Sequence, residues 1–528
     1  MRSAKIYTLV ATTCSMIGLS VILCDRPTEA GATAPELEQA LCEVLQAAEY
    51  KHAHWGLYIV DAQTGQPLLE HNADRLFAPA SVTKLFSVAA ALDALGADYR
   101  FQTPVYRRGT VDAHGVLAGD LILVASGDLN FGGRCTADGR LEFKNVDHTY
   151  ANGNDRAEWT QADPVAGLRI LAEQVAAAGI RRVTGDIVID DRLFERAEGT
   201  GSGPTRLTPI MVNDNLIDLR IVPTQPGQRA RVEWRPQTAL WQVDAQVFTV
   251  GPDAATRVRV GRPEEGRLVV RGQIAAGQAP LVRVAEVEDA ARFARALFIE
   301  CLRVCGVAVE ASVHEHNDVS KLPARDAVAH LPKLAEYVSP PFAEAVRVIL
   351  KVSHNLHAST LPLLVAAQRG HKTLAEGLYQ QGRILERLGV DVSAISFGGG
   401  AGGARADYVT PRATVQLLRA MAGHRDFAAY YEALPILGVD GTLADAVDAS
   451  SPARGKVRAK TGTLFWYNGL TRRYLLTSKA LAGYMDTARG RRLMFAFFVN
   501  GVHLDKATDT VKVGRALGRL CEIVYSRM

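Results

Sequence analysis

A serine and a lysine three residues apart are the first residues of this 528-residue sequence that could act together chemically. Ser81 opens a mostly apolar run from Val82 to Leu95 whose only charged residues are Lys84 and Asp93, which predicts a helix buried on all sides. On such a helix Ser81 and Lys84 share one face. A desolvated lysine has a lowered pKa and can take the serine proton, so the pair predicts a nucleophile with its base. The alternative is an ordinary helix start with a solvated lysine.

Two further polar motifs follow later in the chain. Ser353-His354-Asn355 lies between helical patterns at 340–350 and 356–368, and such a turn can aim Ser353 and Asn355 into a cleft. Helix capping is the alternative for these two residues. The stretch 455–464 alternates like a strand and contains Lys460-Thr461-Gly462. Because glycine lets another backbone lie close and lysine can neutralise a carboxylate, this strand predicts a place for an anionic substrate group.

The rest of the pattern predicts two kinds of structure that must hold these motifs. Between about residues 97 and 313 the chain consists mainly of short strands and turns. We therefore expect a strand-rich domain inserted into another domain, which suits a chain too long for one core. Helices and strands of the outer domain are predicted at 35–49, 55–61, 66–70, 480–485, 493–500 and 506–527.

Composition and the N-terminus exclude some classes of function. The formal net charge is only +4, whereas a nucleic-acid-binding protein needs a clustered basic face. No internal run reaches the ~18 apolar residues of a membrane span. Arg2 and Lys5 precede an apolar stretch and then small residues, which predicts a signal peptide over residues 1–34 and export. An uncleaved anchor is the alternative.

The cysteines do not indicate a metal site. Cys14 and Cys24 lie in the predicted signal peptide, which leaves an odd number for an oxidising compartment. Cys301 and Cys305 are spaced like one turn of a helix, but no second pair of ligands gives them metal-binding spacing. We therefore predict that they are buried thiols.

The three motifs occur in an order that belongs to a known group of proteins. Ser81-x-x-Lys84, then Ser353-x-Asn355, then Lys460-Thr461-Gly462 resembles the signature of penicillin-binding proteins and serine β-lactamases. The long interval between the first two motifs resembles the D-alanyl-D-alanine carboxypeptidase/endopeptidase family, the class C low-molecular-mass penicillin-binding proteins, which carries a large inserted domain there. Other stretches also look like this family: Gly119-Asp120-Leu121, Gly185-Asp186-Ile187, Asn213-Asp214-Asn215, Val409-Thr410-Pro411-Arg412 and Gly438-Val439-Asp440-Gly441-Thr442-Leu443.

The resemblance implies an α+β fold. A penicillin-binding-protein/β-lactamase-like transpeptidase domain, with an antiparallel sheet flanked by helices, would carry a large strand-rich inserted domain. We expect parts of the peptidase domain at 35–96 and 316–528 and the insertion at 97–315. In this superfamily the first and last helices pack side by side, so we expect Cys42 and Cys521 to bond or to touch.

The resemblance also implies an activity. The protein would be a serine DD-peptidase that hydrolyses D-Ala-D-Ala and D-Ala-diaminopimelate crosslinks in peptidoglycan. It would need no metal or cofactor, bind neither nucleic acid nor a membrane after leader cleavage, react with β-lactam antibiotics, and be periplasmic or otherwise exported. A catalytically idle wall-binding scaffold is one alternative. A serine β-lactamase is another, although no separate Glu-bearing loop like that of the class A enzymes is visible.

Specific roles follow for the residues that match the family's motifs. Ser81 would be the acylated nucleophile and Lys84 its base, while Ser353 would relay a proton and Asn355 would hold Lys84 and the substrate amides. The implied substrate-binding residues are Lys460, Thr461, Gly462, Thr463, Asp128 and Arg405. Of these, Asp128 from the insertion and Arg405 from the peptidase domain would hold the zwitterionic end of diaminopimelate. Turn capping by Asp128 and simple exposure of Arg405 are the alternative.

Two stretches depart from the family's pattern. Gly399-Gly400-Ala401-Gly402 stands where the family usually has Asp-Gly-Ser-Gly. The stretch from Phe465 to Lys479 is longer than the family's short connection and could narrow the cleft or change access to it. Neither departure removes a predicted catalytic residue.

Overall fold

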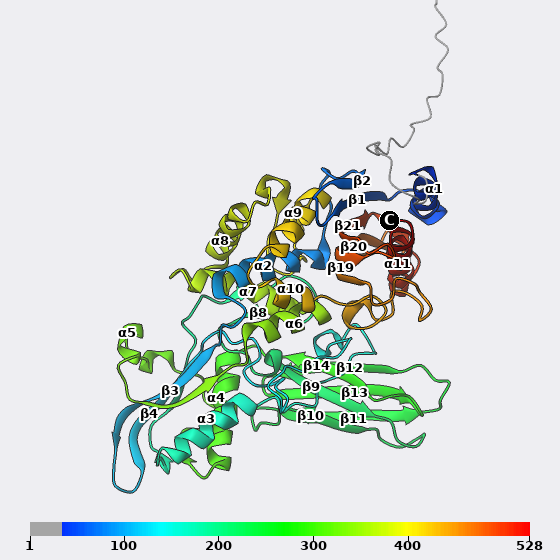
Figure 1. The fold of residues 1–528 in the computed structure, drawn as a ribbon. Helices are drawn as coiled ribbons and strands as arrows, with labels where there is room; N and C mark the ends of the chain where they lie inside the picture. The colour runs from blue at the N-terminus through cyan, green and yellow to red at the C-terminus, as the bar shows by residue number, and fades with distance from the viewer. Residues whose placement is uncertain (1–33) are drawn as a thin grey trace, which may run out of the picture.

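The computed structural model of the protein describes residues 34–528 (Figure 1). Positions 1–33 of the predicted signal peptide therefore lie outside the described residues. Within residues 34–528, no helix is long and apolar enough to cross a membrane. The two ends of the chain form one body of sheet and helices, and the segment between them forms a second body beside it (Figure 1).

The two ends of the chain build one antiparallel sheet. Its strand order is β19-β20-β21-β1-β2, and β22 pairs with β20. β1 lies against β21 along its whole length, so that Trp55 pairs with Val499. β21 is buried from its second residue onward, as its almost continuous apolar sequence requires. The strands are β1 (His54–Asp61), β2 (Pro67–His71), β19 (Val457–Asn468), β20 (Arg473–Asp486), β21 (Arg492–Asn500) and β22 (Val502–Leu504).

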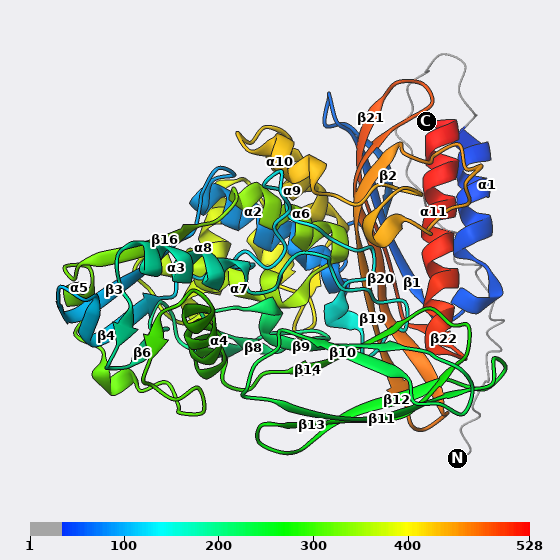
Figure 2. The ribbon, with the colours of Figure 1, turned by 90° about the horizontal axis from the view of Figure 1, so that it is seen from below.

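Two helices cover one face of this sheet. α1 (Ala34–Leu45) and α11 (Thr510–Arg527) pack side by side on it, as expected (Figure 2). Their apolar sides, including Leu41 and Leu520, share one core with the strands. Cys42 and Cys521 lie on these helices, but both are free thiols, so the bond does not form, and the alternative that the two side chains touch stays a prediction. Packing of two helices does not by itself bring one side chain of each to bonding distance.

The other face of the sheet carries a layer of helices with α2 (Thr83–Leu95) at its centre. Every residue from Thr83 to Leu92 is buried, which matches the absence of a polar side in this segment. α2 packs against α6, α7 and α8. The other helices of this layer are α6 (Phe342–Val352), α7 (Asn355–Ala367), α8 (Leu374–Arg387), α9 (Pro411–Ala422) and α10 (Phe427–Glu432).

The segment between α2 and α6 is the predicted strand-rich insertion. It contains a sheet of order β15-β5-β4-β3-β16, with β6 beside β4, and two three-stranded sheets of order β10-β9-β14 and β11-β13-β12. The first sheet packs with α3 (Ala166–Ala177) and α4 (Ala290–Val304) around a core separate from that of the peptidase sheet. Its strands are β3 (Gln102–Val111), β4 (Val116–Val124), β5 (Arg182–Val183), β6 (Ile187–Asp190), β15 (Ala308–Val309) and β16 (Lys333–Val338). Those of the smaller sheets are β9 (Leu216–Val222), β10 (Arg231–Arg235), β11 (Gln242–Val250), β12 (Arg257–Glu264), β13 (Arg267–Ala275) and β14 (Leu281–Glu286).

The residues directly after 315 include a strand of the insertion. β16 pairs antiparallel with β3, with Tyr337 opposite Thr103, and so belongs to the sheet of the insertion. α6 then begins at Phe342 in the helical layer of the peptidase domain. We propose that the insertion ends near residue 340.

Candidate active site

Ser81 and Lys84 meet at the start of α2. Ser81 lies in a short 3-10 turn, Ala80–Val82, that leads directly into the helix. Lys84 Nζ lies 2.8 Å from Ser81 Oγ, and it donates to Asn355 Oδ1 at 2.7 Å and to the Ala401 carbonyl at 2.8 Å. The structure therefore brings the first two predicted motifs together around one amine.

The environment of Lys84 favours its neutral form. Its side chain is fully buried, and burial lowers its pKa well below the ordinary range, with a further contribution from the charge of Lys460. The charge of Asp407 acts on the pKa of Lys84 in the opposite direction, but its carboxylate accepts the backbone N–H groups of Gly398 and Ala404 rather than bonding to the lysine. Among the described residues, no carboxylate forms an ion pair with Lys84. A neutral amine at hydrogen-bond distance from a hydroxyl can act as its base.

The turn between α6 and α7 presents Ser353 and Asn355 to the two lysines. Ser353 ends α6 in the left-handed region, with φ of 64°, and α7 begins at Asn355. The Ser353 hydroxyl accepts a hydrogen bond from Lys460 Nζ at 3.0 Å. Because Asn355 accepts from Lys84, the turn joins the serine motif to the strand motif.

Strand β19 passes close to the start of α2 and carries the third motif. A Cβ on Gly462 would lie 2.3 Å from the Pro79 carbonyl oxygen, so only glycine allows this approach. Lys460 is fully buried, and burial lowers its pKa from 10.5 to about 7. The sequence predicted that Gly462 would let another backbone lie close to this strand, and the contact with Pro79 agrees with that prediction.

The threonines of β19 have polar partners that spacing in the sequence did not reveal. Thr461 Oγ1 donates to Thr442 Oγ1 at 2.7 Å. Lys479 of β20 is paired with Thr463 of β19 in the sheet, and it donates to Thr463 Oγ1 at 2.9 Å. Burial lowers the pKa of Lys479 to about 8. The only signal for Lys479 is the strand register, which requires the pairing of β19 with β20 to be known.

The stretch that departs from the family's pattern contributes through its backbone. The Ala401 carbonyl accepts from Lys84, and the Gly400 carbonyl accepts from Ser87 Oγ at 2.8 Å. Gly402 has φ of 90°, and a Cβ there would lie 1.9 Å from the Ala80 carbonyl oxygen. This segment therefore supports the start of α2 without supplying a side chain.

Asp128 and Arg405 are not joined in the structure. Asp128 is buried in the insertion, where Oδ1 accepts the backbone N–H of Asn130 and Oδ2 has no partner among the described residues. Burial raises the pKa of Asp128 to about 6. Arg405 is exposed, and no hydrogen bond or ion pair links it to Asp128 within residues 34–528. Their proposed role in holding diaminopimelate stays a prediction.

The layers and the site together define the class of protein. A helix carrying the serine motif lies between a helical layer and an antiparallel sheet, and the insertion separates the first two motifs, as in the penicillin-binding-protein fold. The structure is similar to that of penicillin binding protein 4 from Haemophilus influenzae, with a TM-score of 0.67, 22% identity, and coverage of 92% of this chain and 99% of that one. The predicted fold class is confirmed.

The sequence comparison is more specific. The chain belongs to the D-Ala-D-Ala carboxypeptidase 3 (S13) family, whose pattern matches residues 37–517. It is 27% identical over 527 residues to a D-alanyl-D-alanine carboxypeptidase of an Actinomadura species, covering 95% of this chain and 87% of the relative. It is 25% identical over 491 residues to D-alanyl-D-alanine carboxypeptidase DacB of Haemophilus influenzae, covering 90% of this chain and 89% of the relative. The family resemblance of the three motifs is confirmed.

Proposed function

We propose that the protein is a serine-type D-Ala-D-Ala carboxypeptidase and endopeptidase that acts on peptidoglycan through an acyl-enzyme on Ser81. The observation that carries the proposal is the contact of Lys84 with both Ser81 and Asn355, at a site where burial lowers the pKa of the lysine. Membership of the D-Ala-D-Ala carboxypeptidase 3 family supports the substrate class.

The first step is acyl transfer to Ser81. Lys84 takes the proton of Ser81 while Oγ forms a bond to the carbonyl carbon between the two D-alanines. The backbone N–H groups of Ser81 and Thr463 stabilise the negative oxygen that develops. The C–N bond then breaks, and the leaving amine receives its proton by way of Ser353, whose hydroxyl is bound by Lys460.

Water completes the cycle by hydrolysing the ester and restoring the Ser81 hydroxyl. In the carboxypeptidase reaction the leaving amine is D-alanine, and in the endopeptidase reaction it is an amine of diaminopimelate in a crosslink. Lys460 and the hydroxyls of Thr461 and Thr463 bind the terminal carboxylate. Lys479, at 2.9 Å from Thr463 Oγ1, adds a second cation to this side of the site.

β-Lactams and the cell wall are the expected partners. The penicillin binding protein 4 of Haemophilus influenzae has also been solved in complex with a β-lactam. We propose that this protein likewise reacts with β-lactams, and that it works outside the cytoplasm on the cell wall. These statements rest on the family and on the predicted signal peptide.

A fluorescent penicillin tests the proposal directly. Stable labelling of the wild type and none of Ser81→Ala, with the label found on Ser81 by mass spectrometry, is the expected result. Release of D-alanine from a peptidyl-D-Ala-D-Ala substrate and cleavage of crosslinked muropeptides would establish the two activities separately. Fast turnover of penicillin would indicate a β-lactamase, and no reaction with any of these would indicate a scaffold.

A further inference from the structure

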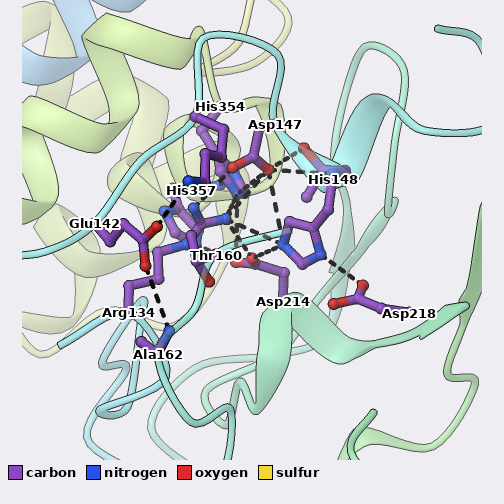
Figure 3. A network of polar contacts seen from close by, with 12 residues as sticks. Arg134, Glu142, Asp147, His148, Thr160, Ala162, Asp214, Asp218, His354 and His357 are labelled. Carbon is purple, nitrogen blue, oxygen red and sulfur yellow. Dashed lines mark hydrogen bonds and ion pairs between the residues drawn. The ribbon is translucent and has the colours of Figure 1, made fainter. Parts of the chain in front are cut away.

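A second buried polar cluster gathers around Asp214 and includes His354 of the Ser353–Asn355 turn (Figure 3). It joins the insertion to the peptidase domain, and each of its side chains is almost completely buried. We call it the interdomain network, and its members are Arg134, Asp147, His148, Asp214 and Asp218 from the insertion and His354 and His357 from the peptidase domain.

Asp214 is the centre of the interdomain network. Its Oδ1 lies 2.6 Å from His357 Nε2 and 3.3 Å from His354 Nε2. Its Oδ2 lies 2.8 Å from both His148 Nε2 and Arg134 Nη2. One carboxylate of the insertion therefore contacts two residues of the 353–357 segment and two cationic or titratable groups of its own domain.

The loop that carries Asp214 has an unusual backbone. Asn213, Asp214 and Asn215 all lie in the left-handed region, with φ of 51°, 54° and 54°. Three such residues in a row are strained, and strain of this kind persists only where the surroundings fix it. Here the Asn213 side chain donates to the Leu216 carbonyl and the Asn215 side chain donates to the Ile210 carbonyl. The loop is thus held in the one shape that points Asp214 inward.

The polar atoms of the interdomain network bond to one another, except His357 Nδ1, which has no hydrogen-bond partner within residues 34–528. Asp214, His354 and His357 are close enough together to hold a metal ion. However, His354 Nδ1 accepts the backbone N–H of His357 at 3.3 Å, and His354 Nε2 lies 3.3 Å from Asp214 Oδ1 and 3.4 Å from Arg134 Nη2. Arg134 already supplies the cation, with both Asp214 and Asp147 as its partners. A metal ion would have to displace these groups.

The insertion contacts every residue of the Ser353–Asn355 turn. The Tyr150 hydroxyl donates to the Ser353 carbonyl, and Asp214 contacts His354. The Asn355 amide donates to the Ser202 carbonyl at 2.9 Å, which leaves its Oδ1 directed to Lys84. Ser353 itself is in a left-handed conformation, which is uncommon for a residue other than glycine. The geometry of the two catalytic side chains therefore depends on groups from another domain.

We propose that the interdomain network, together with Tyr150, is a positioning device for the reaction, which holds Ser353 and Asn355 at the lysines. The proposal rests on the function proposed above. Buried ion pairs add little net stability, but they can specify a single geometry, and that is the role assigned here. Asp214 and Tyr150 are positioning residues, since they contact the turn itself, and the other members of the insertion act through their contacts with Asp214 and with one another.

Two variants and two matched controls test this role. Asp214→Asn keeps the shape of the side chain but removes its charge, and Tyr150→Phe removes a single hydroxyl. Asp186→Asn is the control for the first, because Asp186 is a buried acid of the insertion paired with Arg295. Tyr484→Phe is the control for the second, because it also removes one buried hydroxyl that donates to a carbonyl. Neither control residue is bonded to the turn.

The readouts are the rate of Ser81 acylation by a fluorescent penicillin, kcat and KM for a peptidyl-D-Ala-D-Ala, and the midpoint of thermal unfolding. Asp214→Asn should lower the acylation rate and kcat about 10- to 100-fold, because a misplaced catalytic group costs on this scale. Tyr150→Phe should lower them about fivefold to tenfold, as for one lost hydrogen bond. KM should change little in these variants. The controls should lose a similar amount of thermal stability, but their acylation rate and kcat should stay within about twofold of the wild type.

The pH profile separates positioning from general loosening of the fold. A displaced turn admits water to Lys84, so its pKa rises and the acid limb of the acylation profile moves to higher pH. This shift is expected for Asp214→Asn and not for Asp186→Asn. Equal losses of rate in variants and controls, or an unmoved limb with an unchanged rate, would overturn the proposal. So would one equivalent of bound transition metal whose removal abolishes activity. If Asp214→Asn does not fold, the acylation rate, kcat and pH profile of Tyr150→Phe decide whether the network positions the turn. An inactive wild type would instead refute the proposed function.

Discussion

The Ser353–Asn355 turn contacts two buried polar clusters that differ in one respect. In one cluster, Lys84 and Lys460 are fully buried, and within residues 34–528 neither forms an ion pair. In the other, Arg134 and His148 are just as buried but face aspartates at 2.6 to 2.8 Å. The same degree of burial thus occurs without counter-charges in one cluster and with them in the other.

The difference has opposite effects on the pKa values. Burial alone lowers the pKa of Lys460 to about 7. Burial also disfavours the charged form of His148, but the charges of Asp218 and Asp147 outweigh it and raise the pKa of His148 to about 10. A buried base without a carboxylate partner can exchange a proton near neutral pH. A buried base that is paired with carboxylates keeps its charge, and the ion pairs fix its geometry. We infer that the first cluster is suited to proton transfer and the second to support.

The largest expected effect comes from removing the base of the unpaired cluster. Lys84→Ala should lower the rate of acylation by penicillin by about 10³-fold, since general-base catalysis contributes on this scale. The fold should survive, because the lysine acts through its proton rather than through an ion pair. Stopped-flow measurement with a fluorescent penicillin gives the rate, and circular dichroism checks the fold. A rate within a few-fold of the wild type would show that the base is wrongly assigned.

Lys460→Met should have the next largest effect, about a 100-fold loss of acylation rate. The charge of Lys460 helps to lower the pKa of Lys84, so its removal should move the acid limb of the pH profile to higher pH. The folded-state pKa of Lys460, about 7, lies below the unfolded value of 10.5, so wild-type stability should rise with pH between these values. The stability difference between wild type and Lys460→Met should follow the same trend in urea unfolding. A difference independent of pH would contradict the unpaired character of this lysine.

Asp128 resembles the unpaired lysines, because it is a buried acidic group that has no ion-pair partner within residues 34–528. If Asp128 binds the amine of diaminopimelate and Arg405 binds its carboxylate, then Asp128→Ala and Arg405→Ala should each lower kcat/KM on diaminopimelyl peptides by about tenfold. Acylation by penicillin, which lacks that group, is the internal control and should barely change. Equal losses on both substrates would show that the two residues act on structure alone.

The sequence could predict the three motifs of the candidate site because each of them is local. Ser81 and Lys84 are one helical turn apart, and Gly462 lies within a strand next to Lys460, so spacing alone indicates the chemistry. Lys479 was missed because its contact with Thr463 depends on the register between two strands. Asp214 was noted only in a family-like stretch, since its partners come from three separate segments without a common spacing.

The limits of the sequence at the level of the fold have similar causes. The strand pattern predicted the insertion, but the later boundary that we propose depends on the pairing of β16 with β3, which the sequence of a short strand does not reveal. The packing of the first and last helices was expected from the family. Whether Cys42 and Cys521 bond depends on the rotation of each helix about its axis, which a resemblance does not supply.

The smallest expected effect concerns the paired cluster and has the opposite sign to that of Lys460. The folded-state pKa of His148, about 10, lies above its ordinary value of 6.5. Its contribution to stability should therefore be fully present below pH 6.5 and be lost as pH rises through about 10. His148→Gln should melt roughly a few degrees below the wild type at pH 6, and the gap should shrink by pH 10. Because other titrating groups are common to both proteins, the difference in melting temperature isolates this histidine. A gap that stays constant, or that widens as in Lys460→Met, would mean that the aspartates do not hold a charge on His148, and the contrast between the two clusters would fail.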